Sequence, residues 1–104
     1  MKIRNAKQVL QAVAQVYTDH PDRFTASALA RDTRDERTDW RANDAYKFCT
    51  LGLLYRIRDE GAAAYGVVQR AIEATGGHCR IVGVNNDQGR EAIIKLARTT
   101  AARL

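Results

Sequence analysis

The chain has 104 residues, of which 45% are hydrophobic and 28% are charged, and its formal net charge is +5. A chain of this size builds one ordinary core, so we expect residues 1–104 to form a single globular domain. No apolar stretch approaches the roughly 20 residues that span a bilayer, and the first residues carry no apolar run typical of signal peptides. The sequence therefore predicts a cytoplasmic protein without a membrane partner.

The two cysteines, Cys49 and Cys79, indicate neither a disulfide framework nor a zinc site. Without a secretory signal a reduced pair is expected. The sequence has no Cys-x-x-Cys pair and no Cys/His quartet, and His78 is merely adjacent to Cys79. We therefore expect no metal and no cofactor.

Arginine carries the positive charge, with 13 of the 17 basic residues. Its guanidinium suits bidentate contacts with phosphate or carboxylate, which makes a nucleic acid or another polyanion a candidate partner. Between Arg31 and Arg41 charges of opposite sign alternate, and this pattern predicts a solvated loop. The excess lies near the two ends, in Lys2, Arg4, Lys7, Arg90, Lys95, Arg98 and Arg103.

The first predicted element is a helix from Asn5 to His20. Its apolar residues recur at helical spacing, Asn5 and Gln8 resemble a capping box, and Pro21 follows its end. Residues 22–42 lack a sustained helical period. Within them, Ser27 to Asp32 predicts a short extended piece or hairpin.

A second helix is expected to begin after Asn43 and to run to about Glu60, with Gly61 at its C-terminal end. Apolar residues cover most of its circumference, which is typical of a helix in the middle of the packing. Cys49 is expected one turn into this helix. Gly52 follows three residues later, where a missing side chain permits close approach of a neighbour.

A third helix is predicted for residues 62–75, with Val67, Val68, Ala71 and Ile72 inward, and Gly76 and Gly77 end it. Residues 79–84 (CRIVGV) then predict a brief buried strand, and 85–89 (NNDQG) a turn. Asp87 is expected to cap a last helix whose inward residues are Ile93, Ile94, Leu96, Ala97 and Ala101. The predicted fold is mainly α, with α+β as the alternative: a compact four-helix domain with a short two-stranded β element.

Cys49 permits two interpretations. It is either a small core residue, since free cysteine is among the most buried residue types, or a nucleophilic thiolate near a helix start. In the second case His78, with Asn86 or Asp87, is the candidate orienting partner. The first interpretation is favoured, because any chain of this size offers a similar set of residues.

Three segments together resemble the DUF6197 family of small bacterial and phage-associated proteins of unknown function: FTASALARD (24–32), AYKFCTLGLL (45–54) and NND (85–87). The likeness spans roughly residues 24–98. Phe24 replaces the family's more usual Trp, Leu53 its Ala, and TRDER its Gly-rich turn. The resemblance implies a fold class and a prokaryotic or phage origin, and it implies no chemistry.

The leading functional hypothesis is a non-catalytic accessory protein that binds a macromolecule, with a host protein or another copy of itself as the expected partner. The candidate binding residues are Trp40, Arg90, Lys95 and Arg98. Trp40 is either a lid over the core or an exposed anchor, and the three cations predict a basic face on the last helix. Two alternatives stay open, a cysteine-dependent hydrolase or transferase and a nucleic-acid-binding protein.

Overall fold

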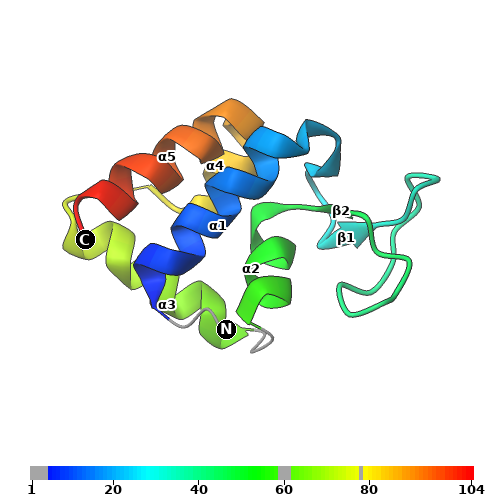
Figure 1. Cartoon of the computed structure of the whole chain (residues 1–104), viewed down its shortest axis with the longest axis horizontal. Coiled ribbons are helices and arrows are strands. Elements are labelled where there is room, and N and C mark those ends of the chain that lie inside the picture. The colour runs from blue at the N-terminus through cyan, green and yellow to red at the C-terminus, as the bar shows by residue number, and fades with distance from the viewer. Residues whose placement is uncertain (1–4, 59–61, 78) are drawn as a thin grey trace.

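Helices make up most of this protein, and two very short strands interrupt them after the first helix (Figure 1). The computed structural model describes residues 5–58, 62–77 and 79–104. The predicted mainly α fold with a small two-stranded β element is confirmed, with a fifth α-helix in these ranges. The elements in chain order are α1 (Ala6–Asp19), the 3-10 helix η1 (Pro21–Arg23), β1 (Ala30–Arg31), β2 (Lys47–Phe48), α2 (Thr50–Arg58), α3 (Ala62–Ala74), α4 (Ile81–Gln88) and α5 (Arg90–Ala102).

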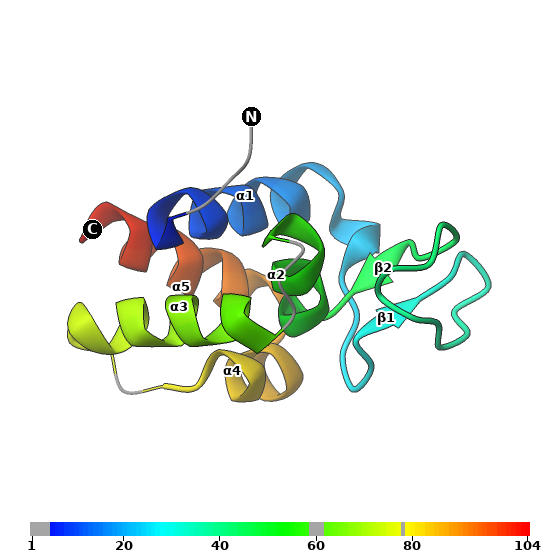
Figure 2. The ribbon, with the colours of Figure 1, turned by 90° about the horizontal axis from the view of Figure 1, so that it is seen from below.

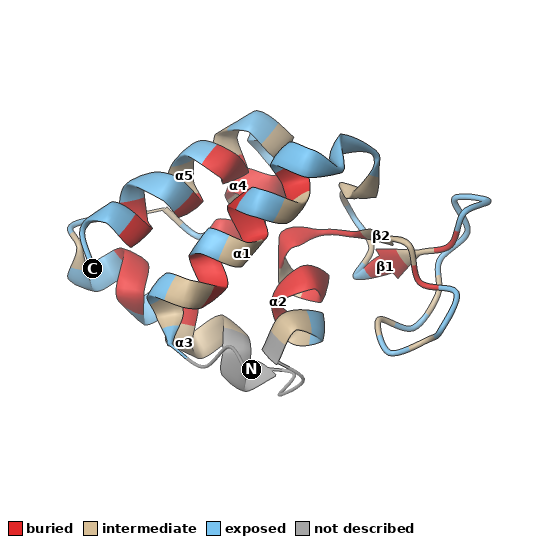
Figure 3. Ribbon diagram, viewed as in Figure 1, coloured by how far each residue is buried: buried red, intermediate tan, exposed pale blue. Residues whose placement is uncertain are grey.

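α1 and α5 lie antiparallel and side by side (Figures 1 and 2). Their facing sides are buried (Figure 3) and form much of the core, with Val9, Leu10, Val13 and Tyr17 from α1 and Ile93, Ile94, Ala97 and Ala101 from α5. Leu96, which we expected to point inward with them, is only half-buried at the edge of the core. It lies about 100° around the helix from Ala97, away from the centre of the buried stripe.

The predicted N-cap of α1 is confirmed. The Asn5 side-chain oxygen accepts a hydrogen bond from the backbone N–H of Gln8 at 2.8 Å. This bond satisfies one of the N–H groups that have no partner within the helix. At the other end α1 stops at Asp19, two residues before Pro21.

The strands β1 and β2 pair in antiparallel register, with Ala30 opposite Phe48. The extended piece expected within residues 27–32 is therefore confirmed. Beyond β1 the chain turns around Asp32, whose carboxylate accepts hydrogen bonds from the backbone N–H groups of Arg34 (2.9 Å) and Glu36 (3.0 Å). The chain between the strands extends away from the helices (Figure 1).

The predicted start of the second helix, after Asn43, is wrong: α2 begins at Thr50, and β2 precedes it. The reason lies in long-range hydrogen bonds that hold Phe48 in extended chain. Its carbonyl accepts from the hydroxyl of Tyr17 (2.9 Å) and from the N–H of Thr25 (3.1 Å). The apolar residues before α2 are therefore buried in β2 and in the residue that follows it. Their local sequence does not reveal the hydrogen bonds from Tyr17 and Thr25.

The bounds of the third helix match the prediction, and three of its four predicted inward residues, Val68, Ala71 and Ile72, are buried, whereas Val67 is only half-buried. α3 covers all but the last of residues 62–75, and Gly76, with φ of 91°, follows at its end. That positive φ is easily reached only by glycine, which explains the stop. Glu60 and Gly61, where we expected the second helix to end, lie outside the described residues.

Residues 79–89 were expected to form a strand and then a turn, but α4 occupies all of this segment except residues 79, 80 and 89. Ile81, Val84 and Asn85 are all buried and recur at i, i+3 and i+4, the period of a helix. A short apolar run is ambiguous between a strand and a buried helix, and in the described part of the chain no strand pairs with this segment. Gly89, with φ of 87°, ends α4 and immediately precedes α5.

Candidate functional site

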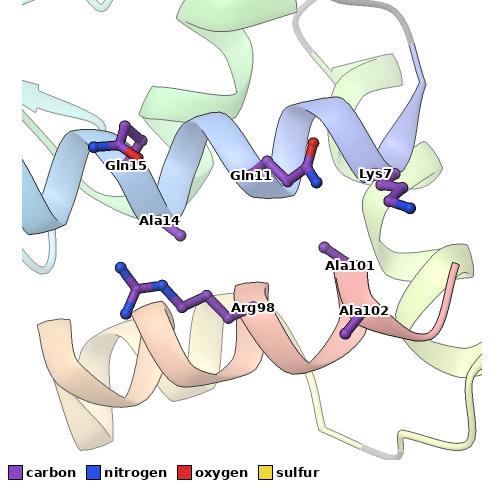
Figure 4. A pocket seen from close by; sticks show the side chains of 7 residues that line it. All are labelled: Lys7, Gln11, Ala14, Gln15, Arg98, Ala101 and Ala102. Atoms are coloured by element: carbon purple, nitrogen blue, oxygen red, sulfur yellow. The ribbon is translucent and has the colours of Figure 1, made fainter.

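A groove runs between α1 and α5 (Figure 4). Its volume is about 520 Å³, and we call it the α1–α5 groove. The alanine side chains in the groove are short, so the longer polar side chains form its walls. The lining residues are Lys7, Gln11, Ala14 and Gln15 from α1 and Arg98, Ala101 and Ala102 from α5.

A cation stands toward each end of this groove, Lys7 at one end and Arg98 at the other (Figure 4). Arg98 Nη2 donates to Thr18 Oγ1 at 3.0 Å, which directs the guanidinium toward α1. No acidic residue lines the groove, and among the described residues Lys7 has no ion-pair partner. Two positive charges without a lining counter-charge favour an anionic ligand.

Arg90, predicted as another basic contact, does not line this groove but stabilises the end of α1. Its Nη1 donates to the carbonyl oxygen of Tyr17 at 2.8 Å. In a continuing helix that carbonyl would accept from residue 21, but Pro21 has no N–H. Arg90 thus supplies the missing donor. Its positive charge also interacts favourably with the negative C-terminal end of the α1 dipole. It also pairs with Glu91, so its guanidinium is engaged within the protein.

Lys95, predicted to share a basic face with Arg98, lines a different groove from Arg98. Its side chain is exposed beside α4, where it lines a second groove with Leu96. Arg98, three residues further along and about 60° around α5, is also exposed but lines the α1–α5 groove. The structure therefore divides the predicted face between two grooves.

Trp40 lies apart from the basic residues, against α2. Its half-buried ring packs edge-on against Tyr55, with ring centroids 5.5 Å apart, and the guanidinium of Arg41 covers it at 4.6 Å. Arg56 Nη1 donates to the Trp40 carbonyl oxygen at 2.8 Å. This packing matches the lid interpretation, while a role of Trp40 in binding a partner stays a prediction.

Cys49 faces a third pocket of about 240 Å³, at the junction of α2, α4 and residues 27–29. It immediately precedes α2 instead of lying one turn inside a helix, and it is buried. Asn86 lines the pocket too, whereas Asp87 does not; Asp87 is exposed within α4 and caps no helix. His78 lies outside the described residues.

The surroundings of Cys49 favour its neutral thiol. Burial raises the pKa of Cys49, and this outweighs the opposing effect of the Gly52 backbone N–H, which donates to Sγ at 3.4 Å. A raised pKa leaves less thiolate, the nucleophilic form, at neutral pH. These contacts support the core interpretation over the nucleophile.

We expect Cys49 to react with a maleimide at least about tenfold more slowly than Cys79 in the native protein, because Cys49 is buried and Cys79 is half-buried. The measurement uses two single-cysteine variants, Cys79→Ser and Cys49→Ser, labelled at equal protein concentration. In urea both cysteines should label at similar rates. Fast native labelling of Cys49 would instead indicate an accessible, reactive thiol.

The prediction of site residues missed the α1 wall of the α1–α5 groove. Lys7, Gln11 and Gln15 recur every four residues, so they form one polar stripe beside the apolar stripe of the same helix. That spacing is visible in the sequence. What it faces is not visible, because only the packing of α5 on α1 places Arg98 opposite this stripe.

The fold and grooves define a mainly α protein with a basic groove between its first and last helices. Comparisons with protein families, curated proteins and solved structures find no match for this chain. Membership of the DUF6197 family therefore stays a prediction. In the ranges that the structure describes, no three or more His, Cys, Asp or Glu side chains are grouped to hold a metal ion, and no helix has the length and apolar character to cross a membrane.

Proposed function

We propose that this protein is a non-catalytic accessory module that binds another protein, and that the α1–α5 groove receives an acidic segment of that partner. The observation that carries the proposal is the pair of cations, Lys7 and Arg98, in a groove whose described lining residues include no acid. An extended segment with carboxylates spaced to reach both cations would replace solvent between the two helices.

The walls of the groove favour a polypeptide over a nucleic acid. Gln11 offers a donor and an acceptor, which suits the N–H and C=O groups of a peptide backbone. Gln15 Nε2 already donates to Asp19 Oδ2 at 2.6 Å, so Gln15 offers mainly its carbonyl oxygen as an acceptor. None of the described residues that line the groove is aromatic, so these residues offer no platform for stacked bases. Two cations are also few for tracking a phosphate backbone.

A cysteine-dependent enzyme is the less favoured alternative. Cys49 is buried, its pKa is raised, and neither a histidine nor a carboxylate lines its pocket among the described residues. A bacterial or phage origin rests on the DUF6197 resemblance alone. The binding proposal does not depend on it.

The proposal is tested by reversing both groove charges, Lys7→Glu with Arg98→Glu. We expect the double variant to bind a fluorescein-labelled oligoglutamate peptide at least about tenfold more weakly than wild type, by fluorescence anisotropy at low salt, because two attractions become repulsions. Wild-type affinity should fall as salt is added. A labelled DNA duplex is titrated in parallel.

The matched control is Arg70→Glu with Arg80→Glu, which changes the net charge equally at two exposed sites outside the groove. It should retain most of the peptide affinity. Equal losses in both double variants would mean that the peptide senses net charge and not the groove. Binding of the duplex but not of the peptide would move the assignment to the nucleic-acid alternative.

A further inference from the structure

The second groove at α5 differs in character from the α1–α5 groove. It lies between α4 and α5, has a volume of about 330 Å³, and is called here the α4–α5 groove. α4 and α5 are neighbours joined through Gly89 (Figure 2). The two helices contribute these residues to its lining: Val84 and Gln88 from α4, and Ala92, Lys95, Leu96 and Thr99 from α5.

The spacing of these residues fits a helix as the occupant. The α5 positions 92, 95, 96 and 99 recur at i, i+3, i+4 and i+7, and the α4 positions 84 and 88 recur at i and i+4. Such rows form the ridges between which a third helix seats its own side chains. α5 thus carries two stripes, one buried in the core and one, around the half-buried Leu96, open to a partner.

The charge of the groove defines the partner's chemistry. Lys95 is exposed on its rim, and within the described ranges no carboxylate pairs with it. The lining residues that the structure describes include no acidic side chain either. A helix that buries apolar side chains against Leu96 therefore also needs a carboxylate beside Lys95.

A second copy of this chain is a poor occupant. A two-fold contact centred on the groove brings the Lys95 side chains of both copies toward one axis, and each chain has a net charge of +5. At low salt the two Lys95 side chains repel each other, and so do the net charges of the two copies. The charge pattern favours an acidic partner over self-association.

We propose that the α4–α5 groove binds an amphipathic helix of another protein, with the apolar stripe of that helix packed on Leu96 and Ala92 and a carboxylate paired with Lys95. This is the helix-in-groove mode of recognition. It concerns a surface separate from the α1–α5 groove, so either site can fail its test without the other.

The test is an NMR titration of the ¹⁵N-labelled protein with two designed amphipathic peptides of about 18 residues, long enough to form helix in isolation. Both carry the same leucine stripe, and glutamates flank it in one peptide and lysines in the other. The glutamate peptide should shift the amide resonances of α4 and α5 around the groove and bind at least about tenfold more tightly than the lysine peptide.

Three variants make the result specific. Lys95→Glu should reverse the preference between the two peptides. Thr99→Glu changes an exposed position and preserves the core, but it places a charge in the groove. It should therefore lower the affinity for the glutamate peptide at least about tenfold. Arg34→Glu, at an exposed position in the chain between β1 and β2, should leave its affinity within about twofold. The proposal is overturned if neither peptide binds, if shifts map elsewhere, if Lys95→Glu keeps the original preference, or if the protein dimerises through this face.

Discussion

Replacing Gly52 by alanine is expected to lower the free energy of unfolding by about 3 kcal/mol, the upper end of the usual effect of overpacking. A Cβ atom at this position would lie 1.9 Å from the carbonyl oxygen of Leu29 and 2.8 Å from its carbonyl carbon. Both are backbone atoms, so no side-chain rotation relieves the clash. α2 would have to move away from the segment that leads into β1, and the Gly52 N–H bond to Cys49 Sγ would be disturbed with it.

The matched control is Gly83→Ala in α4, where an added Cβ meets no atom within 4 Å. There the substitution removes only the helix penalty of glycine, so stability should rise by up to about 1 kcal/mol. Urea unfolding of both variants, followed by circular dichroism, gives the two signs side by side. A Gly52→Ala protein as stable as wild type would show that Leu29 does not hold α2 at this distance.

The elements that the sequence predicted well are those fixed by local interactions. α1 starts at an asparagine that bonds to its own first turn, and α3 stops before Gly76, whose positive φ ends the helix. In α1, α3 and α5 the apolar positions also follow a helical period over more than three turns. Signals of this kind need no knowledge of the rest of the chain.

The errors fall where distant residues decide the local structure. Residues before Thr50 are extended because Tyr17 and Thr25 bond to the Phe48 carbonyl, and no local pattern reports bonds across such separations. The α1–α5 groove is similar. Its polar stripe on α1 is periodic, but its opposite wall, with Arg98, depends on which helix packs alongside. Arg90, expected on the basic face of the last helix, is engaged by a distant residue for the same reason, since it donates to a carbonyl that Pro21 leaves without a donor.

Asn85, expected in a turn, is instead the polar centre of the junction between α2, α4 and the chain before β1. Its side chain is 2% exposed. Oδ1 accepts from the backbone N–H of Thr50 (2.8 Å) and from the Thr50 hydroxyl (2.7 Å). Nδ2 donates to the carbonyl of Thr25 (3.3 Å) and to Asn86 Oδ1 (3.1 Å). α4 therefore supplies the acceptor for the first N–H of α2, a group with no partner inside its own helix.

Asn85→Ala is accordingly expected to cost about 3 kcal/mol of unfolding free energy, because it removes the acceptor of the buried Thr50 N–H and the donor to the half-buried Thr25 carbonyl, and opens a small cavity. Asn86→Ala is the control. Asn86 is exposed, and its Oδ1 accepts from the backbone N–H of Ser27 (3.2 Å) and from Asn85 Nδ2 (3.1 Å). Asn85 Nδ2 still donates to the Thr25 carbonyl when Asn86 is truncated, so this change should cost less than about 1 kcal/mol. Urea unfolding measures both. Equal, small losses would mean that water replaces Asn85 at the start of α2, and that packing of α4, not this bond, fixes where the helix begins.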